Sequence, residues 1–345
     1  MAPAHVGDLR PVVVRRSNSP ERRPDDGLGD EGPDRPRLGR IECPLQLRGQ
    51  LTGVAEGVTI WIARPVLIGG RNMTEPAEPG TIAAFVAEPI VGATLGAVAP
   101  PDDYWPKIAE VCRRHGALLI ADEVMTGFGR TGRWFGLDHW GVRADLLVAA
   151  KGATSGYWPF GFVAASADVH DAVMGAGGFI HGFTYSHAPA GAAVAREVLR
   201  ILESENLVEA SATKGIRFRD LLEARLGAHP NVGEIRGRGF LIGLELVADR
   251  TTRAAFPRTA RLTEAIIRGA RSRGVLVYSS TGHADGVNGD LILLGPPFVV
   301  TNEELVRIVA GLAEAIEEGV ASLETEATAS PGSPRGAAAE SPAAG

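Results

Sequence analysis

The segment between about residues 80 and 151 alternates short apolar runs with an amphipathic pattern, and this alternation restricts the fold more than any other feature. The apolar runs are TIAAFVAEP, ALLIADEV and ADLLVAAKG. Runs of this kind are typical of strands buried on both faces of a parallel sheet. Between the first two lies PPDDYWPKIAEVCRRHG, a predicted helix with apolar side chains from Trp105 to Cys112 on one face and Gly116 as its stop. The pattern predicts an α/β fold with a mainly parallel sheet.

Composition divides the rest of the chain into segments of different character. Residues 1–77 are rich in Arg, Asp, Pro and Gly and are predicted to be largely disordered, because few apolar groups offset the entropy of ordering. Residues 78–205 carry the α/β pattern of a partial large domain, and residues 206–325 read as a smaller α+β domain. The low-complexity tail 326–345 is predicted to be disordered. Within the smaller domain, helices are expected near 207–227 and 259–273.

Bulk properties exclude several classes of protein. The 345 residues carry a mild net charge of −6, which argues against nucleic acid as the main partner. No apolar run approaches the roughly 20 residues that span a bilayer, so no membrane association is expected. The N-terminus has no continuous apolar core of a signal peptide. Two cysteines, Cys43 and Cys112, form neither a disulfide framework nor a metal-ligand spacing, and we therefore expect a cytoplasmic protein without a metal site.

A scarce lysine ends one of the apolar runs. Ligands bind at the carboxyl ends of strands in parallel sheets, and Glu88, Asp122 and Lys151 lie at or just past such ends. Only three of the 35 basic residues are lysine, so arginine serves wherever any cation is sufficient. Lys151 is either a surface lysine or a partly desolvated amine that attacks carbonyl groups, a reaction that arginine cannot perform.

Asp122 also allows two interpretations. It ends the run LLIAD and precedes a Gly-rich loop, where a carboxylate commonly caps a turn. At a ligand-binding edge it could instead pair with the protonated ring nitrogen of pyridoxal phosphate (PLP).

Five ordered segments carry a family resemblance. They are AEPIVG, LLIADEVMTGFGRTGRWFGLDHWGVRADLLVAAKG, HGFTYSHAPAGAA, VGEIRGRGFLIGLEL and LLGPPFVVTNEEL. Together they resemble the class III aminotransferases, PLP enzymes of fold type I, over roughly residues 78–325. The resemblance implies a PLP-transferase fold type I with a partial large domain and a smaller C-terminal domain. It also implies that this chain lacks the family's N-terminal portion.

The same resemblance assigns roles to four residues. Lys151 resembles the lysine that forms a Schiff base with PLP, and Asp122 resembles the partner of the pyridinium nitrogen. Val124 resembles the residue packed on one face of the ring. Thr184 resembles the hydroxyl that reaches the PLP phosphate of a partner subunit, so the resemblance implies a homodimer.

The chain departs from the family pattern in several places. Met125 replaces the usual glutamine, and Ala93 and Leu293 replace a glutamate–arginine pair found in some relatives. The joint loss of that pair suggests another means of holding a substrate carboxylate. The 121 residues before Asp122 contain neither the SGSEA-like phosphate-binding turn nor the YHG-like aromatic of the family.

Three functions remain open at this point. The first is an aminotransferase that moves an amino group from an amine or amino acid to a keto acid. The second is a non-catalytic remnant or dimerisation partner, because PLP held without a phosphate-binding turn should bind weakly. The third is another fold-type-I reaction, such as an aminomutase or a decarboxylase.

Three further features have structural and functional interpretations. RGRG at 236–239 could bind a carboxylate or a phosphate, but as a turn entering a strand it is expected to be structural. His181 and His187 are expected to be loop or interface residues, since no second ligand cluster accompanies them. Tyr157 and Trp158 either line a substrate funnel or pack against neighbours.

Overall fold

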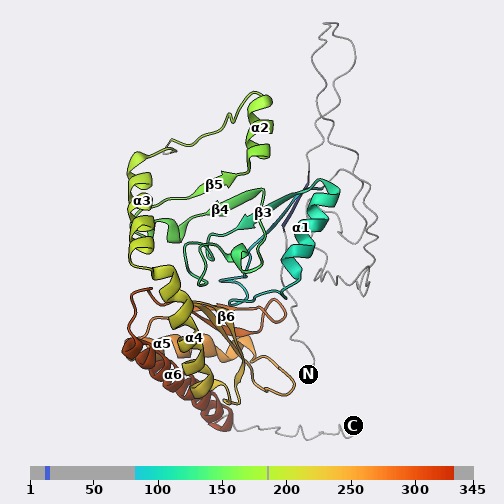
Figure 1. Cartoon of the computed structure of the whole chain (residues 1–345). Helices are drawn as coiled ribbons and strands as arrows, with labels where there is room; N and C mark the ends of the chain where they lie inside the picture. Colours follow the sequence, from blue (N-terminus) through green and yellow to red (C-terminus); the bar gives the residue numbers. More distant parts are fainter. Residues whose placement is uncertain (1–11, 16–81, 185, 330–345) are drawn as a thin grey trace, which may run out of the picture.

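The computed structural model describes residues 12–15, 82–184 and 186–329, which form two separate sheets (Figure 1). The first sheet has the order β1-β2-β3-β4-β5 and the second has the order β6-β7-β9-β8. Strands of the first sheet are β1 Val12–Arg15, β2 Ile82–Ala87, β3 Leu118–Asp122, β4 Leu146–Ala149 and β5 Phe162–Ala165. Strands of the second are β6 Val232–Arg238, β7 Leu241–Leu246, β8 Tyr278–Thr281 and β9 Asp290–Leu294.

The centre of the first sheet is parallel. β2 pairs with β3 and β3 pairs with β4 in parallel register, whereas the outer strands β1 and β5 are antiparallel to their neighbours. The predicted parallel sheet is therefore confirmed for the three strands that were recognised in the sequence. The antiparallel edges make the sheet mixed.

Helix α1, Tyr104–His115, covers this sheet and ends as predicted. Its buried side chains Trp105, Ile108 and Cys112 pack in one cluster with Leu119 and Ala121 of β3. Gly116 adopts φ 61° and its amide donates to the carbonyls of Arg113 and Cys112, which closes the helix. Each fully buried side chain of this size contributes about 1.5–3 kcal/mol through the apolar surface removed from water.

The second sheet and three helices form the largest core. β6 and β7 are adjacent antiparallel strands, and β9 lies between β7 and β8. Helices α4 Leu207–Leu226 and α5 Leu262–Ser272 agree closely with the ranges predicted from the sequence. Thr301 and Glu304 form a capping box at the start of α6, Asn302–Ala329, through reciprocal side chain to amide hydrogen bonds of 3.2 and 2.8 Å.

A connection of low burial joins the two parts. Helix α2, Ala167–Gly175, has no buried residue, and all four residues of β5 are exposed. Figure 1 shows α2 and its connection to α3, Pro189–Ser204, beyond the β5 edge of the sheet. Short 3-10 helices complete the described elements: η1 Gly136–His139, η2 Lys151–Thr154 and η3 Arg258–Ala260.

The domain limits inferred from composition stay predictions. The segment 1–77 lies outside the described residues except for β1, which pairs with β2. The tail 330–345 also lies outside them. Helix α6 ends at Ala329, four residues past the predicted boundary at 325. Alanine and glutamate in that stretch favour helix, which accounts for the extension.

Candidate active site

The carboxyl ends of β2, β3 and β4 bring three ionisable side chains to one edge of the first sheet. Ala87 of β2 is the register partner of Ala121 in β3. Glu88, the residue after β2, therefore lies level with Asp122, the last residue of β3. Asp122 is in turn the partner of Val148 in β4, three residues before Lys151. Glu88 and Lys151 are 34 and 29 positions from Asp122 in the sequence, and the parallel register brings all three to the same edge of the sheet.

Asp122 is half-buried and has one oxygen engaged. Its Oδ1 accepts a hydrogen bond from the amide of Val124 at 3.1 Å, which fixes the carboxylate at the start of the loop. Within the described residues no donor is in hydrogen-bond range of Oδ2. One carboxylate oxygen is therefore available to a ligand.

Lys151 is the first residue of η2 and adopts φ 38°. A positive φ is unfavourable for a residue with a side chain, and such strain is often found at functional positions. The side chain is exposed, and its amine makes no hydrogen bond within the described part of the chain. The partly desolvated amine considered from the sequence is therefore not observed, because no described segment covers the ammonium group.

Glu88 is a third member of the site, to which reasoning from the sequence gave a position but no role. Its Oε2 accepts a hydrogen bond from the amide of Gly92 at 3.0 Å. Burial raises the pKa of Glu88, and repulsion from Asp122 raises it further, whereas the Gly92 amide and the charge of Lys151 lower it. Glu88 is thus electrostatically coupled to both other members.

The other predicted residues lie in different surroundings. Val124 and Met125 are half-buried directly after the Asp122–Glu123 pair. The Met125 sulfur packs against Gly92, where an added Cβ would be 2.7 Å from it. Thr184 is exposed in the connection between α2 and α3. Its role toward a partner subunit stays a prediction.

A buried carboxylate fixes the loop that follows Asp122. Glu123 is fully buried, and it accepts hydrogen bonds from the amides of Gly136 at 2.7 Å and Leu137 at 3.0 Å and from the hydroxyl of Thr126. Burial is the largest influence on this group and raises its pKa. These bonds attach the start of the loop to η1, so the Asp122 backbone has a rigid support.

Arg236 and Leu293 make contacts that support the fold rather than bind a ligand. Arg236 contacts two carboxylates and two backbone carbonyls, which confirms that it is structural and leaves no free guanidinium edge for an anion. Leu293 is buried in an apolar cluster with Ile90, Ala97 and Leu241. An arginine there would be a buried charge without its glutamate partner, so the joint replacement of that pair is physically consistent.

Two aromatic side chains follow the lysine loop. Tyr157 is 81% exposed and Trp158 is 43% exposed. Trp158 lies over the start of α3, where a Cβ added to Gly191 would be 3.1 Å from its ring. Its carbonyl accepts a hydrogen bond from the Thr154 hydroxyl at 2.7 Å. Trp158 therefore packs, whereas Tyr157 has no such neighbour among the contacts described.

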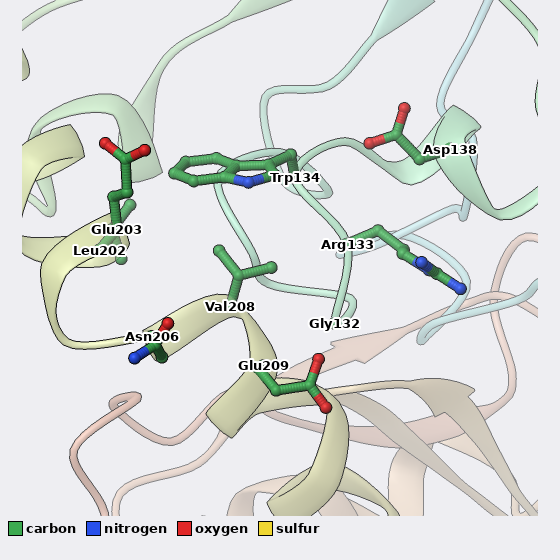
Figure 2. A pocket seen from close by; sticks show the side chains of 9 residues that line it. All are labelled: Gly132, Arg133, Trp134, Asp138, Leu202, Glu203, Asn206, Val208 and Glu209. Carbon is green, nitrogen blue, oxygen red and sulfur yellow. The ribbon is translucent and has the colours of Figure 1, made fainter.

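A separate pocket of about 450 Å³ lies between the loop after β3 and the α3–α4 junction (Figure 2). None of the predicted site residues lines it. Figure 2 shows the Trp134 indole across from Val208, with carboxylates at its rim. Its lining residues are Gly132, Arg133, Trp134, Asp138, Leu202, Glu203, Asn206, Val208 and Glu209.

The described residues contain no group of three or more His, Cys, Asp or Glu side chains able to hold a metal ion. Nor does any described helix have the length and apolar character needed to cross a membrane.

The residues present fit one part of a PLP molecule. The free oxygen of Asp122 suits a ring N–H donor, and the Lys151 amine at the next strand end suits the carbonyl carbon on the far side of the ring. The phosphate-binding turn typical of such sites is absent from the sequence before Asp122. The described residues therefore account for the ring end of the cofactor and not for its phosphate end.

Comparison with known proteins decides the family. The sequence profile described as Aminotransferase class-III matches residues 71–316. The chain belongs to the class III aminotransferase family. Among its curated relatives, an uncharacterized aminotransferase, YodT, of Bacillus subtilis is 39% identical over 243 residues, covering 69% of this chain and 55% of YodT. The putrescine–pyruvate aminotransferase of Pseudomonas aeruginosa is 38% identical over 242 residues, covering 70% of this chain and 51% of that protein.

Solved structures of transaminases share the fold. An (S)-enantioselective omega-transaminase from Thermomicrobium roseum superposes with a TM-score of 0.64 at 40% identity, covering 70% of this chain and 52% of the other. A transaminase from Virgibacillus gives 0.67 at 38% identity, covering 71% and 54%. This family member thus has the predicted fold type I, and it spans about half the length of the relatives that it matches.

Proposed function

We propose that this class III family member is a PLP-dependent aminotransferase, which transfers an amino group from an amine or amino acid to a keto acid. The observation that supports this most is the meeting of Asp122 and Lys151 at adjacent parallel strand ends, with Glu88 coupled to both. A carboxylate and a primary amine in this arrangement match the two ends of a pyridoxal ring.

Each residue would have a distinct task. When bound, PLP supplies an electron sink for negative charge at the substrate Cα. Asp122 Oδ2 would hold the proton on the ring nitrogen, while the Val124 amide keeps Oδ1 in place. Lys151 Nζ would hold the cofactor at its carbonyl carbon and then move a proton to and from the substrate. Val124 would pack on one face of the ring.

The proposal includes a homodimer with the Thr184 hydroxyl serving the partner's PLP phosphate. The exposure of Thr184 supports this arrangement. A cytoplasmic location stays a prediction from composition.

A visible absorbance spectrum of the purified chain with added PLP tests the proposal. We expect a band from lysine-bound cofactor that disappears in Lys151→Ala and remains in the matched variant Lys107→Ala. Lys107 is suited to the control because it lies on α1, outside the site, where it pairs with Asp103. Transfer of amino groups from an amine panel to pyruvate or 2-oxoglutarate would then separate an aminotransferase from an aminomutase.

A second candidate rests on a specific observation, the absence of the phosphate-binding turn from the sequence before Asp122. A phosphate cup supplies several charge-assisted hydrogen bonds of about 1.5–3 kcal/mol each. A chain that holds PLP without them would bind it weakly, and the second candidate function is therefore that of a non-catalytic partner. Absence of any visible band at saturating PLP would contradict catalysis and favour this second function.

A further inference from the structure

A short turn lies between the second sheet and the candidate site, and one arginine of that sheet donates hydrogen bonds to the backbone of the turn. The turn, Val91 to Val98, follows Glu88 and is closed by two hydrogen bonds between Val91 and Val98, of 2.9 and 3.1 Å. We call this segment the 91–98 turn. Arg236 of β6 donates from Nη2 to the carbonyl of Leu95 at 2.6 Å and from Nε to the carbonyl of Gly96 at 2.9 Å. One planar guanidinium thus binds two successive carbonyls of the turn.

The charge of Arg236 is balanced within its own sheet. Its Nη1 contacts Glu234 at 2.8 Å and Glu245 at 2.5 Å, and its side chain is only 13% exposed. The neighbouring His283 and then Arg236 lower the pKa of Glu245 to about 2, so this carboxylate stays ionised at neutral pH. Two carboxylates therefore hold the guanidinium on the β6–β7 pair, while its remaining donors face the turn.

Packing makes the contact specific for the backbone of the turn. Gly243 of β7 is the cross-strand partner of Arg236, and a Cβ at Gly243 would be 2.1 Å from the carbonyl oxygen of Gly96. The turn thus rests directly on the β7 backbone beside the guanidinium. Ile90 and Ala97 add an apolar contact with Leu241 and Leu293 of the second sheet.

The turn transmits this contact to Glu88. The amide of Gly96 donates to the carbonyl of Gly92 at 2.8 Å, and the amide of Gly92 donates to Glu88 at 3.0 Å. Glu88 is the carboxylate that interacts electrostatically with Asp122 and Lys151. Two hydrogen bonds therefore separate the Arg236 contact from the site.

We propose that Arg236 is a positioning residue for the candidate active site, which seats the 91–98 turn and thereby holds the Glu88 carboxylate beside Asp122. Arg236 touches neither Asp122 nor Lys151, so it would act on catalysis only through Glu88. Its relevance to catalysis rests on the proposed function. The seating of the second sheet on the turn then sets the electrostatic field at the site. Any movement of that sheet would change the position of the Glu88 carboxylate.

The amide proton of Gly92 reports on this arrangement without cofactor. Because it donates to Glu88, its NMR chemical shift follows the ionisation of Glu88 as pH changes, and Glu88→Gln removes that dependence and so assigns the signal. In Arg236→Gln we expect the pH-dependent shift to be largely lost and exchange of this amide with solvent to rise at least about tenfold, since the local opening that exposes it becomes easier.

Arg258→Gln is the matched control. Arg258 makes a paired contact with Glu264 in the same half of the molecule but does not touch the turn, so both Gly92 readouts should match the wild type. Should Arg236→Gln fail to fold, Arg236→Lys keeps the charge but cannot bind both carbonyls as a fork, and it should show the same changes in weaker form. An unchanged Gly92 signal in a folded Arg236 variant would overturn the proposal, even if the wild type binds PLP. A chain that shows the Gly92 changes but no PLP band would refute the proposed function while supporting the role of Arg236 in positioning Glu88.

Discussion

At the scale of single residues, Glu123 shows how the loop after Asp122 is fixed by one buried acid. Both its oxygens accept backbone amides of η1, and the Thr126 hydroxyl adds a third donor. A buried carboxylate is costly unless its lone pairs are used in this way. The side chain is therefore a structural support for Asp122 and Val124 rather than a member of the site.

Glu123→Gln is expected to destabilise the fold by about 1–3 kcal/mol, because one side of the amide is a donor and would face the Gly136 or the Leu137 amide. Burial raises the pKa of Glu123, so its stabilising contribution is full below about pH 4.5 and is lost as pH rises through the folded pKa. The stability advantage of the wild type over the variant should therefore shrink as pH rises. Urea unfolding at a series of pH values measures this. Asp220→Asn, the corresponding change at an exposed acid on α4, should alter stability by less than about 0.5 kcal/mol, and equal effects at both positions would contradict this account.

The sequence contains enough information to locate Lys151 and Asp122 but not their supports. The two stand out because one is scarce and both end apolar strands. The role of Glu88 depends on its hydrogen bond to Gly92 and on the parallel register with β3. Arg236 is 140 and 141 positions from the two carbonyls that it binds, and no local sequence pattern predicts contacts over such a separation. The exposure of Lys151 likewise depends on what covers it, which a strand pattern does not describe.

At the scale of elements, β7 lies against the 91–98 turn with no space for a side chain at Gly243. An added Cβ would be 2.1 Å from a backbone oxygen, which is too close for either element to accept without moving. Gly175, at the end of α2, has nothing within 4 Å of the same added atom. The two glycines therefore allow one chemical change to be tested in opposite surroundings.

Gly243→Ala should lower the free energy of unfolding by about 1–3 kcal/mol through overpacking between the two elements. Gly175→Ala should leave it unchanged or raise it by up to about 1 kcal/mol, because alanine favours helix over glycine. Thermal unfolding of the two variants beside the wild type gives the comparison. If Gly243→Ala is as stable as Gly175→Ala, the close approach of β7 to the turn is wrong.

Elements were easier to predict than their contacts. Helices α1, α4 and α5 agree with the helices predicted from the sequence, and Thr301 and Glu304 at the start of α6 have the sequence spacing of a capping box. The segment EIRGRGFLIGLEL forms two strands, β6 and β7, because Gly239 adopts φ 54° and lets the chain reverse. The glycine appears in the sequence, but its conformation depends on its contact with Thr131 and Gly132 in the other half of the chain.

At the scale of the whole molecule, the β5 edge of the first sheet and the connection after α2 present apolar side chains to solvent. The connection after α2 carries Phe179, Ile180 and Phe183, which are 76%, 93% and 75% exposed. The β5 edge strand is exposed along its full length. Such a concentration of apolar surface is typical of an interface with another chain. Thr184 follows directly, so contact between two copies would bring it toward a partner, as the proposed homodimer requires.

Ile180→Glu should therefore weaken self-association without altering the stability of the subunit. The carboxylate would lose its hydration in an interface, at a cost of several kcal/mol, whereas in a free subunit this side chain meets only water. Sedimentation velocity over a range of concentrations should show a dimer for the wild type and a shift toward monomer for the variant. Leu276→Glu is the matched control, because Leu276 is 83% exposed near the second sheet, and this variant should associate like the wild type. If both variants sediment like the wild type, or if the wild type stays monomeric at all concentrations, the α2–α3 connection is not a homodimer interface and Thr184 has no partner site to serve.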